Sequence, residues 1–166
     1  MERYQKIAQH EKFLKYIKKI RKLEKDRIYC CHGPEHLMDV ARIASLKAAE
    51  EGIGLSKDII YGAALLHDIG KVSQYKKKIP HEIAGAKKAG KILAECGYSK
   101  EEIQMIEHAI LHHRRGTKKD RDEIEETAPL SRLLYEADKA SRMCMFCKAQ
   151  ETCNWTKEEK NSIICY

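Results

Sequence analysis

Residues 56–71, SKDIIYGAALLHDIGK, decide the fold and indicate where the chemistry takes place. Residues 59–66 are apolar on almost every face of a helix, which predicts a central, buried helix. That helix ends in the adjacent pair His67 and Asp68, and Gly70 stops it. An ionised carboxylate at the end of a buried helix is costly unless it is paired or bound to a metal. The pair therefore marks a candidate metal site inside the protein.

The rest of the chain predicts further helices and no sheet. Its 166 residues are enough for one domain, and they include only two Val, three Pro and nine Gly among many good helix formers. The expected class is all-α, a single-domain helical bundle. Apolar spacing and capping residues predict helices at 4–26, 34–51, 57–67, 80–97, 100–113 and 129–138 and a last short one from Thr156, with a basic loop at 76–78 and a polar loop at 114–127.

Composition narrows the classes of function. The longest apolar stretch, residues 59–66, is far shorter than the roughly 20 residues that span a bilayer, so no membrane partner is expected. The N-terminus has no apolar signal core, which predicts a cytoplasmic protein. A net charge of +7 attracts anions such as phosphates or nucleic acid. Seven Cys, an odd count, argue against a disulfide framework and leave reduced thiols or a metal site.

Further candidate ligands occur beside apolar positions of other predicted helices. A lone His on a half-buried face is usually a packed or capping residue. Several such residues on several helices favour a shared metal site, although spacing alone leaves both interpretations open. The candidates are His36, His81, His108, His112, His113 and Asp138.

These residues together resemble the HD-domain superfamily of metal-dependent phosphohydrolases, whose pattern is a first His, a His-Asp pair and a distal Asp. The matching segments are EHLMDVAR at 35–42, LLHDIGK at 65–71 and YEADK at 135–139, so the likeness spans about residues 30–142. The resemblance implies an all-α bundle in which a first metal is bound by His36, His67, Asp68 and Asp138.

Members of that superfamily with two metals have additional His residues between the pair and the distal Asp. Here PHEIAGA at 80–86 and AILHH at 109–113 are similar to those elements. They imply His81 and either His112 or His113 as ligands, of which His113 fits the spacing to Gly116 slightly better; His108 is a spare candidate. The likeness is to branches that cleave diadenosine tetraphosphate or cyclic dinucleotides. Residues 114–116, RRG, replace the Gly-Tyr-Pro signature, which argues against cyclic di-GMP.

The expected chemistry is hydrolysis of a phosphoester or phosphoanhydride, most simply in a nucleotide, by metal-activated water. Imidazoles with a bridging carboxylate suit Fe, Mn, Zn, Co or Ni better than Mg, and one or two such ions are expected. Positive side chains near the ligands would hold the phosphate oxygens. The expected catalytic residues are Asp68, Lys71 and Lys139, and the expected substrate-binding residues are Lys71, Arg114, Arg115, Lys139 and Arg142.

A Cys-containing appendage follows the expected HD-type domain. The predicted parts are an N-terminal helix at 1–27 that packs on the core, the metal-binding helical domain at 28–143 and the appendage at 144–166. Cys30 lies six residues before His36, and Cys144 lies six after Asp138, so antiparallel packing would bring both to one end of the bundle. Cys30, Cys144, Cys147 and Cys153 are therefore a candidate thiolate site for Zn or an iron–sulfur cluster, with ordinary reduced thiols as the alternative.

Two other functions remain open at this point. Some HD-like diiron proteins are oxygenases, and the His set does not distinguish them from hydrolases. A non-catalytic module could bind nucleotide or nucleic acid through the basic surface. One Trp and two Phe are few for a single-strand binder, so nucleic acid is not favoured. The expected partner is a small phosphorylated molecule, and a homo-oligomer is compatible with the sequence.

Overall fold

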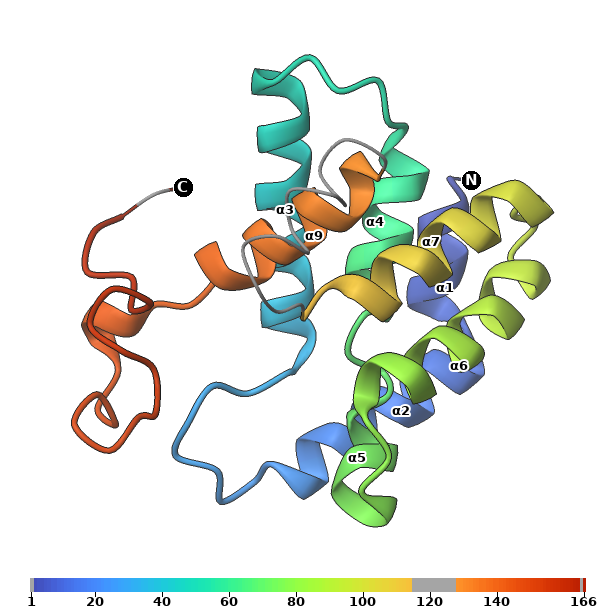
Figure 1. The fold of residues 1–166 in the computed structure, drawn as a ribbon. Helices are drawn as coiled ribbons and strands as arrows, with labels where there is room; N and C mark the ends of the chain where they lie inside the picture. The colour runs from blue at the N-terminus through green and yellow to red at the C-terminus, as the bar shows by residue number, and fades with distance from the viewer. Residues whose placement is uncertain (1, 115–127, 165) are drawn as a thin grey trace.

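A computed structural model describes residues 2–114, 128–164 and 166, and within them it contains helices and no strand (Figure 1). The all-α prediction is confirmed. None of the helices described is long and apolar enough to cross a membrane. The elements are α1 (Arg3–Gln9), α2 (Glu11–Leu23), α3 (Pro34–Glu50), α4 (Lys57–Leu66), α5 (Lys71–Lys77), α6 (His81–Glu95), α7 (Lys100–His112), α9 (Pro129–Ala140) and the 3-10 turn η1 (Cys144–Phe146).

Helix α4 is the central helix, as its all-round apolar sequence predicts. It packs against α1, α3, α6, α7 and α9. The Ser56 hydroxyl caps it by accepting a hydrogen bond from the backbone N–H of Ile59 at 3.3 Å. Its C-terminal half is buried from Gly62 onward, and Leu66 is fully buried. The His-Asp pair that follows is therefore delivered to the middle of the bundle.

The prediction of one continuous helix at 4–26 is wrong, because the structure has two helices that are separated at His10. This residue has extended backbone angles (φ −70°, ψ 128°), and its ring accepts a hydrogen bond from the N–H of Lys12 to cap α2. The break lets α1 pack on α4 while α2 packs on α5. Of the predicted apolar face, Phe13, Ile17 and Ile20 are buried, whereas Leu14 and Leu23 are 51% and 41% exposed.

The predicted loop at 76–78 is also corrected, because α5 begins directly after Gly70 and includes Lys76 and Lys77. Gly70 is required by a close approach of α6 to this corner. A Cβ at Gly70 would lie 1.9 Å from the carbonyl oxygen of His81, so any larger residue would push the two segments apart. The contact brings the first residue of α6 to the end of α4.

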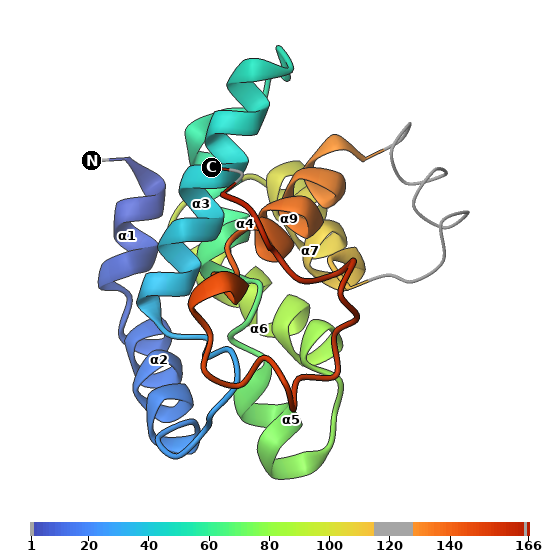
Figure 2. The ribbon, with the colours of Figure 1, turned by 90° about the vertical axis from the view of Figure 1, so that its left-hand side faces the viewer.

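The C-terminal segment 143–166 has little regular structure. The capping contacts between Thr156 and Glu159 are present, but turns follow them in place of the predicted helix. Asn161 ties the segment to the end of α9 by donating to the carbonyls of Lys139 and Arg142. Figure 2 shows the segment running in front of the helices on one side of the bundle. The loop predicted at 114–127 lies, beyond Arg114, outside the described residues.

Candidate metal centre

Six buried side chains from five segments form two groups of potential metal ligands that share Asp68. The first ligand group contains the N-terminal turn of α3, the end of α4 and the last turn of α9; the second adds the first residue of α6 and the residue after α7. Within each group, the ligand atoms lie within 4.8 Å of one another. The first ligand group is His36, His67, Asp68 and Asp138, and the second ligand group is Asp68, His81 and His113.

The carboxylate of Asp68 faces both groups, one oxygen to each. Its Oδ2 lies 3.1 Å from Nε2 of His67 and 3.5 Å from Nε2 of His36. Its Oδ1 lies 3.3 Å from Nε2 of His81. Asp138 completes the first group, with Oδ1 at 3.2 Å from Nε2 of His36. A carboxylate whose two oxygens point to different imidazole sets is arranged to bridge two cations.

Each of the four ligand imidazoles has its outer nitrogen occupied by a hydrogen-bond acceptor. An Nδ1–H donor of this kind fixes the ring and leaves the Nε2 lone pair for a metal. Ser141 can accept from His36 because its own hydroxyl donates to the carbonyl of Asp138 at 2.8 Å. The four contacts of Nδ1 are His36 to Ser141 Oγ at 3.1 Å, His67 to Ala64 O at 2.8 Å, His81 to Gln74 Oε1 at 2.5 Å and His113 to Ile110 O at 2.6 Å.

The two groups differ in charge. Burial lowers the pKa of His67, but the carboxylates of Asp68 and Asp138 outweigh burial and raise that pKa to about 10. In the second group, burial lowers the pKa of His81 to about 2 and that of His113 to about 4. At neutral pH the first group therefore holds a proton on His67, whereas the imidazoles of the second group are neutral.

Two cationic side chains reach the carboxylates. The ammonium of Lys71 lies 3.7 Å from Oδ1 of Asp68, and burial lowers its pKa. Nη2 of Arg142 donates to Oδ1 of Asp138 at 2.8 Å and lies 3.2 Å from Nε2 of His36. Both residues were expected from the sequence near the site, and the structure places them there. Their charge offsets that of the buried carboxylates.

Comparison with known proteins agrees with this geometry. The family model of the HD domain matches residues 34–143, which is well over half of the chain. The chain belongs to the HD-domain family. The six ligand residues of the two groups are accordingly called the HD centre below.

The relatives differ in how much of their length the chain covers. A Clostridium beijerinckii protein named only "Uncharacterized protein" is 43% identical over 166 residues, the whole of both chains. Ribonuclease Y of Clostridium kluyveri is 35% identical over 82 residues, which is 49% of this chain and 16% of that enzyme. Ribonuclease Y of Rubrobacter xylanophilus is 33% identical over 93 residues, 56% of this chain and 16% of that enzyme. No solved structure matches the chain significantly.

Of the adjacent His112 and His113, the structure brings only His113 into the HD centre. Helix α7 ends at His112, whose Nδ1 contacts the carbonyl of His108 at 2.7 Å. The rings of His108 and His112 stack with centroids 4.1 Å apart, and neither residue belongs to the two ligand groups found in the described chain. The preference for His113 in the sequence agrees with this placement.

His32 is a feature of the site that sequence reasoning missed. It is buried; its Nδ1 lies 2.5 Å from Oε1 of Glu24, and its Nε2 points to Oδ2 of Asp68 at 4.0 Å. The hydroxyl of Tyr75 donates to the same oxygen of Glu24. The signal that could have found it is its place four residues before His36. Because Glu24 comes from the end of α2, its role as a partner is visible only in three dimensions.

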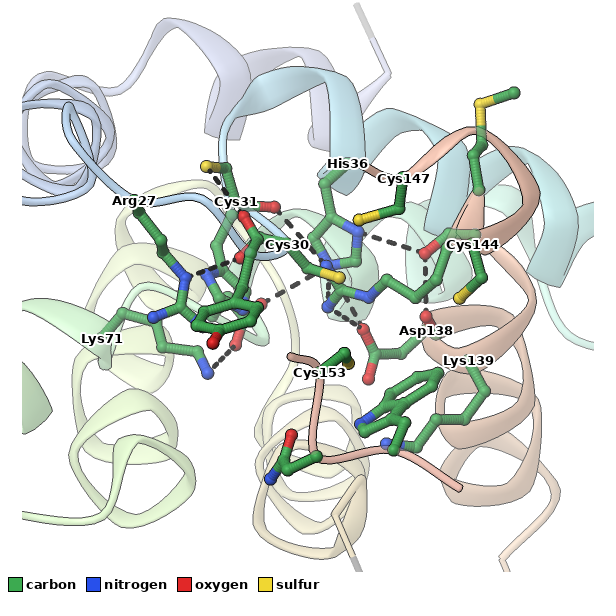
Figure 3. Close-up of a pocket in the computed structure, with 18 of the residues that line it drawn as sticks. Arg27, Cys30, Cys31, His36, Lys71, Asp138, Lys139, Cys144, Cys147 and Cys153 are labelled. Carbon is green, nitrogen blue, oxygen red and sulfur yellow. Dashed lines mark hydrogen bonds and ion pairs between the residues drawn. The ribbon is translucent and has the colours of Figure 1, made fainter. Parts of the chain in front are cut away.

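The HD centre opens into a cavity of about 540 Å³, a size that suits a small ligand. Figure 3 shows one wall of this cavity. Lys139 lines the cavity, but its ammonium lies over the Trp155 ring, 4.7 Å from the centroid. Arg114 also lines it and is exposed, while Arg115 lies outside the described residues. The candidate thiolate residues Cys30, Cys144, Cys147 and Cys153 all border the same cavity.

Proposed function

We propose that this protein hydrolyses a phosphoester or phosphoanhydride bond of a nucleotide with one or two transition-metal ions at the HD centre. The observation that carries the proposal is the carboxylate of Asp68, which offers separate oxygens to His67 and His81 at 3.1 and 3.3 Å. Imidazole nitrogens with carboxylates fit Fe, Mn, Zn, Co or Ni. Membership of a family of metal-dependent phosphohydrolases supports the same chemistry.

The residues of the chain have separable tasks in this reaction. Two bound ions would supply an acidified water as nucleophile and would neutralise phosphate charge. The buried imidazoles hold the ions, because their outer nitrogens are already fixed by hydrogen bonds. Lys71 and Arg142 bind the non-bridging phosphate oxygens from opposite ligand groups, and so stabilise charge that grows during attack.

A nucleotide fits the cavity for two reasons. Its basic lining, which includes Arg27 and Lys160, attracts phosphate, and Tyr29, Tyr75 and Trp155 offer rings on which a base could stack. The volume of about 540 Å³ limits what can enter whole. A second candidate substrate is RNA, because ribonuclease Y shares the matched part of the chain. Only a few nucleotides of an RNA strand would then occupy the cavity.

The test is hydrolysis by purified protein loaded with Mn²⁺ or with Fe²⁺ without oxygen. The panel contains bis(p-nitrophenyl) phosphate, mononucleotides, dinucleoside polyphosphates and a short RNA. We expect turnover of a nucleotide, lost in His113→Ala and retained in His112→Ala, which is the matched neighbour outside the HD centre. Binding without turnover would instead support a non-catalytic module. Dioxygen consumption without phosphate release would indicate an oxygenase.

A further inference from the structure

Four cysteines from two distant parts of the chain gather beside the HD centre. Cys30 comes from the loop before α3, and the other three come from the segment after α9 (Figure 3). Two contacts fasten these parts together: the hydroxyl of Tyr29 donates to the carbonyl of Thr152 at 3.2 Å, and Nη1 of Arg142 contacts the carbonyl of Cys31 at 3.5 Å. All four thiols are free and border one cavity.

The segment 143–166 buries too few apolar side chains to explain how it is held against the helical bundle. In its described residues, only Cys144 and Ala149 are buried. Large apolar side chains point outward instead: Phe146 is 68% and Ile164 is 77% exposed. Its regular structure, within the same residues, is the single turn η1. A short segment with so small a core is usually held by a disulfide or a metal.

The surroundings of the thiols suit an anionic metal centre. Cys144 and Cys147 lie at the two ends of one tight turn, since the N–H of Cys147 donates to the carbonyl of Cys144 at 3.0 Å. The cavity that they border is also lined by basic residues, among them Arg27, Lys139, Arg142 and Lys160, whose charge would offset that of an anionic metal centre.

We propose that Cys30, Cys144, Cys147 and Cys153 bind an iron–sulfur cluster that fastens the C-terminal segment over the HD centre. Spacing favours a cluster over zinc. Zinc–sulfur bonds of about 2.3 Å bring the four sulfurs of a tetrahedral site to within about 4 Å of one another. In the described chain, only the two ligand groups of the HD centre gather three or more ligand atoms within 4.8 Å. A [4Fe–4S] cluster accepts wider spacing, because each of its four thiolates binds a different iron atom.

The cluster and the HD centre would meet at Arg142. This side chain contacts Asp138 and His36 of the HD centre on one side and the carbonyl of Cys31 on the other. Fastening the segment would therefore fix one wall of the cavity and the position of the guanidinium. The cluster has a structural task here: it would bind through residues other than the ligands of the HD centre, and it would influence hydrolysis only through the position of Arg142.

The experiment is anaerobic purification with Mn²⁺ supplied for the HD centre, followed by assay of iron, zinc and acid-labile sulfide. We expect a brown protein with iron and sulfide in about equal amounts. Cys30→Ser and Cys153→Ser should lose the sulfide, whereas Cys31→Ser, an exposed neighbour, and Cys96→Ser, directly after α6, should keep it. Trypsin should cleave the 143–166 segment faster in the first pair than in the second.

Three results would overturn the proposal: wild-type protein without labile sulfide, equal loss in Cys30→Ser and Cys31→Ser, or tightly bound zinc at the four cysteines in place of iron. If the Cys→Ser variants do not fold, X-ray absorption of the wild-type protein decides instead, since a cluster requires iron with sulfur neighbours. His67→Ala separates the two proposals, because it should abolish hydrolysis and leave the brown colour unchanged.

Discussion

The two halves of the HD centre share Asp68 but differ in how they balance charge. The first ligand group adds a second carboxylate, Asp138, and meets it with a protonated His67 and the guanidinium of Arg142. The second ligand group adds two imidazoles that burial keeps neutral, with Lys71 as the nearest cation. Because the first half offers an ion two carboxylates and the second half only the shared one, we expect an ion that has displaced the proton of His67 to be held more tightly in the first half.

From this difference we expect the two ligand groups, which share Asp68, to hold metal ions with different affinities. The first half, with its two carboxylates, would retain an ion more tightly. The second half has neutral nitrogens and lies beside Lys71, where a weakly held ion and a phosphate oxygen could exchange with the cavity. Asp68 couples the halves, because its loss would remove a ligand from both.

The largest effect is expected from Asp68→Asn. The amide keeps the size of the carboxylate, but it removes the negative charge and one of the two bridging oxygens. Both ions should be lost on desalting, and hydrolysis should fall by about 10³-fold or more. Metal content and phosphate release are measured on the same sample. Asp26→Asn, at an exposed position, is the control, and an active, metal-replete Asp68→Asn would refute the bridging role.

Removing one imidazole from each half should give unequal results. His81→Ala should leave about one ion per chain, since the first ligand group is intact. His67→Ala should leave almost none, because Asp68 then lacks its closest neighbour in the site. Metal analysis after gel filtration measures both. Equal metal content in the two variants would contradict the expected difference between the two ligand groups.

The hydrogen bonds to Nδ1 of the ligand imidazoles should affect the metal affinity of each ligand group separately. Ser141→Ala removes the acceptor for His36 and should weaken the first ion by about 10- to 100-fold, whereas Gln74→Ala should do so for the second. Chelator competition gives both affinities. Ser45→Ala is the matched control on the same helix as His36, because the Ser45 hydroxyl has no hydrogen-bond partner within the described structure. Equal effects of Ser45→Ala and Ser141→Ala would show that the hydrogen bond is irrelevant.

The two ligand groups should also differ in the pH dependence of metal binding. Because the pKa of His67 is raised to about 10, a metal entering the first half at lower pH must displace its proton. Affinity there should rise by about tenfold per pH unit between about pH 6 and pH 9. His81 and His113, with pKa values of about 2 and 4, have no proton to lose in that range. Metal titrations of His81→Ala and wild type at several pH values test this, and a flat profile for the first ion would contradict it.

The sequence predicted those parts of the fold and site that depend on local pattern. The all-round apolar stretch at 59–66 identified the central helix, and the motifs around His36, His67 and Asp138 indicated ligands that the structure gathers at one point. Their convergence could be predicted because each of these residues follows or interrupts an apolar stripe, and the stripe fixes which side of the helix faces the core.

Features that depend on contacts between distant segments could not be predicted from local sequence pattern. Helix α5 was missed because a lysine-rich stretch after a glycine is typical of a loop, while the need for Gly70 arises from the carbonyl of His81. The break at His10 depends on α1 and α2 packing against different helices. Which of His112 and His113 faces the HD centre depends on the exact residue at which α7 ends.

Anomalous diffraction from crystals of the Mn²⁺-loaded protein tests the central claim most directly. The account predicts two peaks about 3.5–4 Å apart, one on each side of the Asp68 carboxylate, with the peak near His67 and Asp138 at higher occupancy. A single peak that Asp68 contacts through one oxygen alone, or peaks remote from both ligand groups, would contradict it.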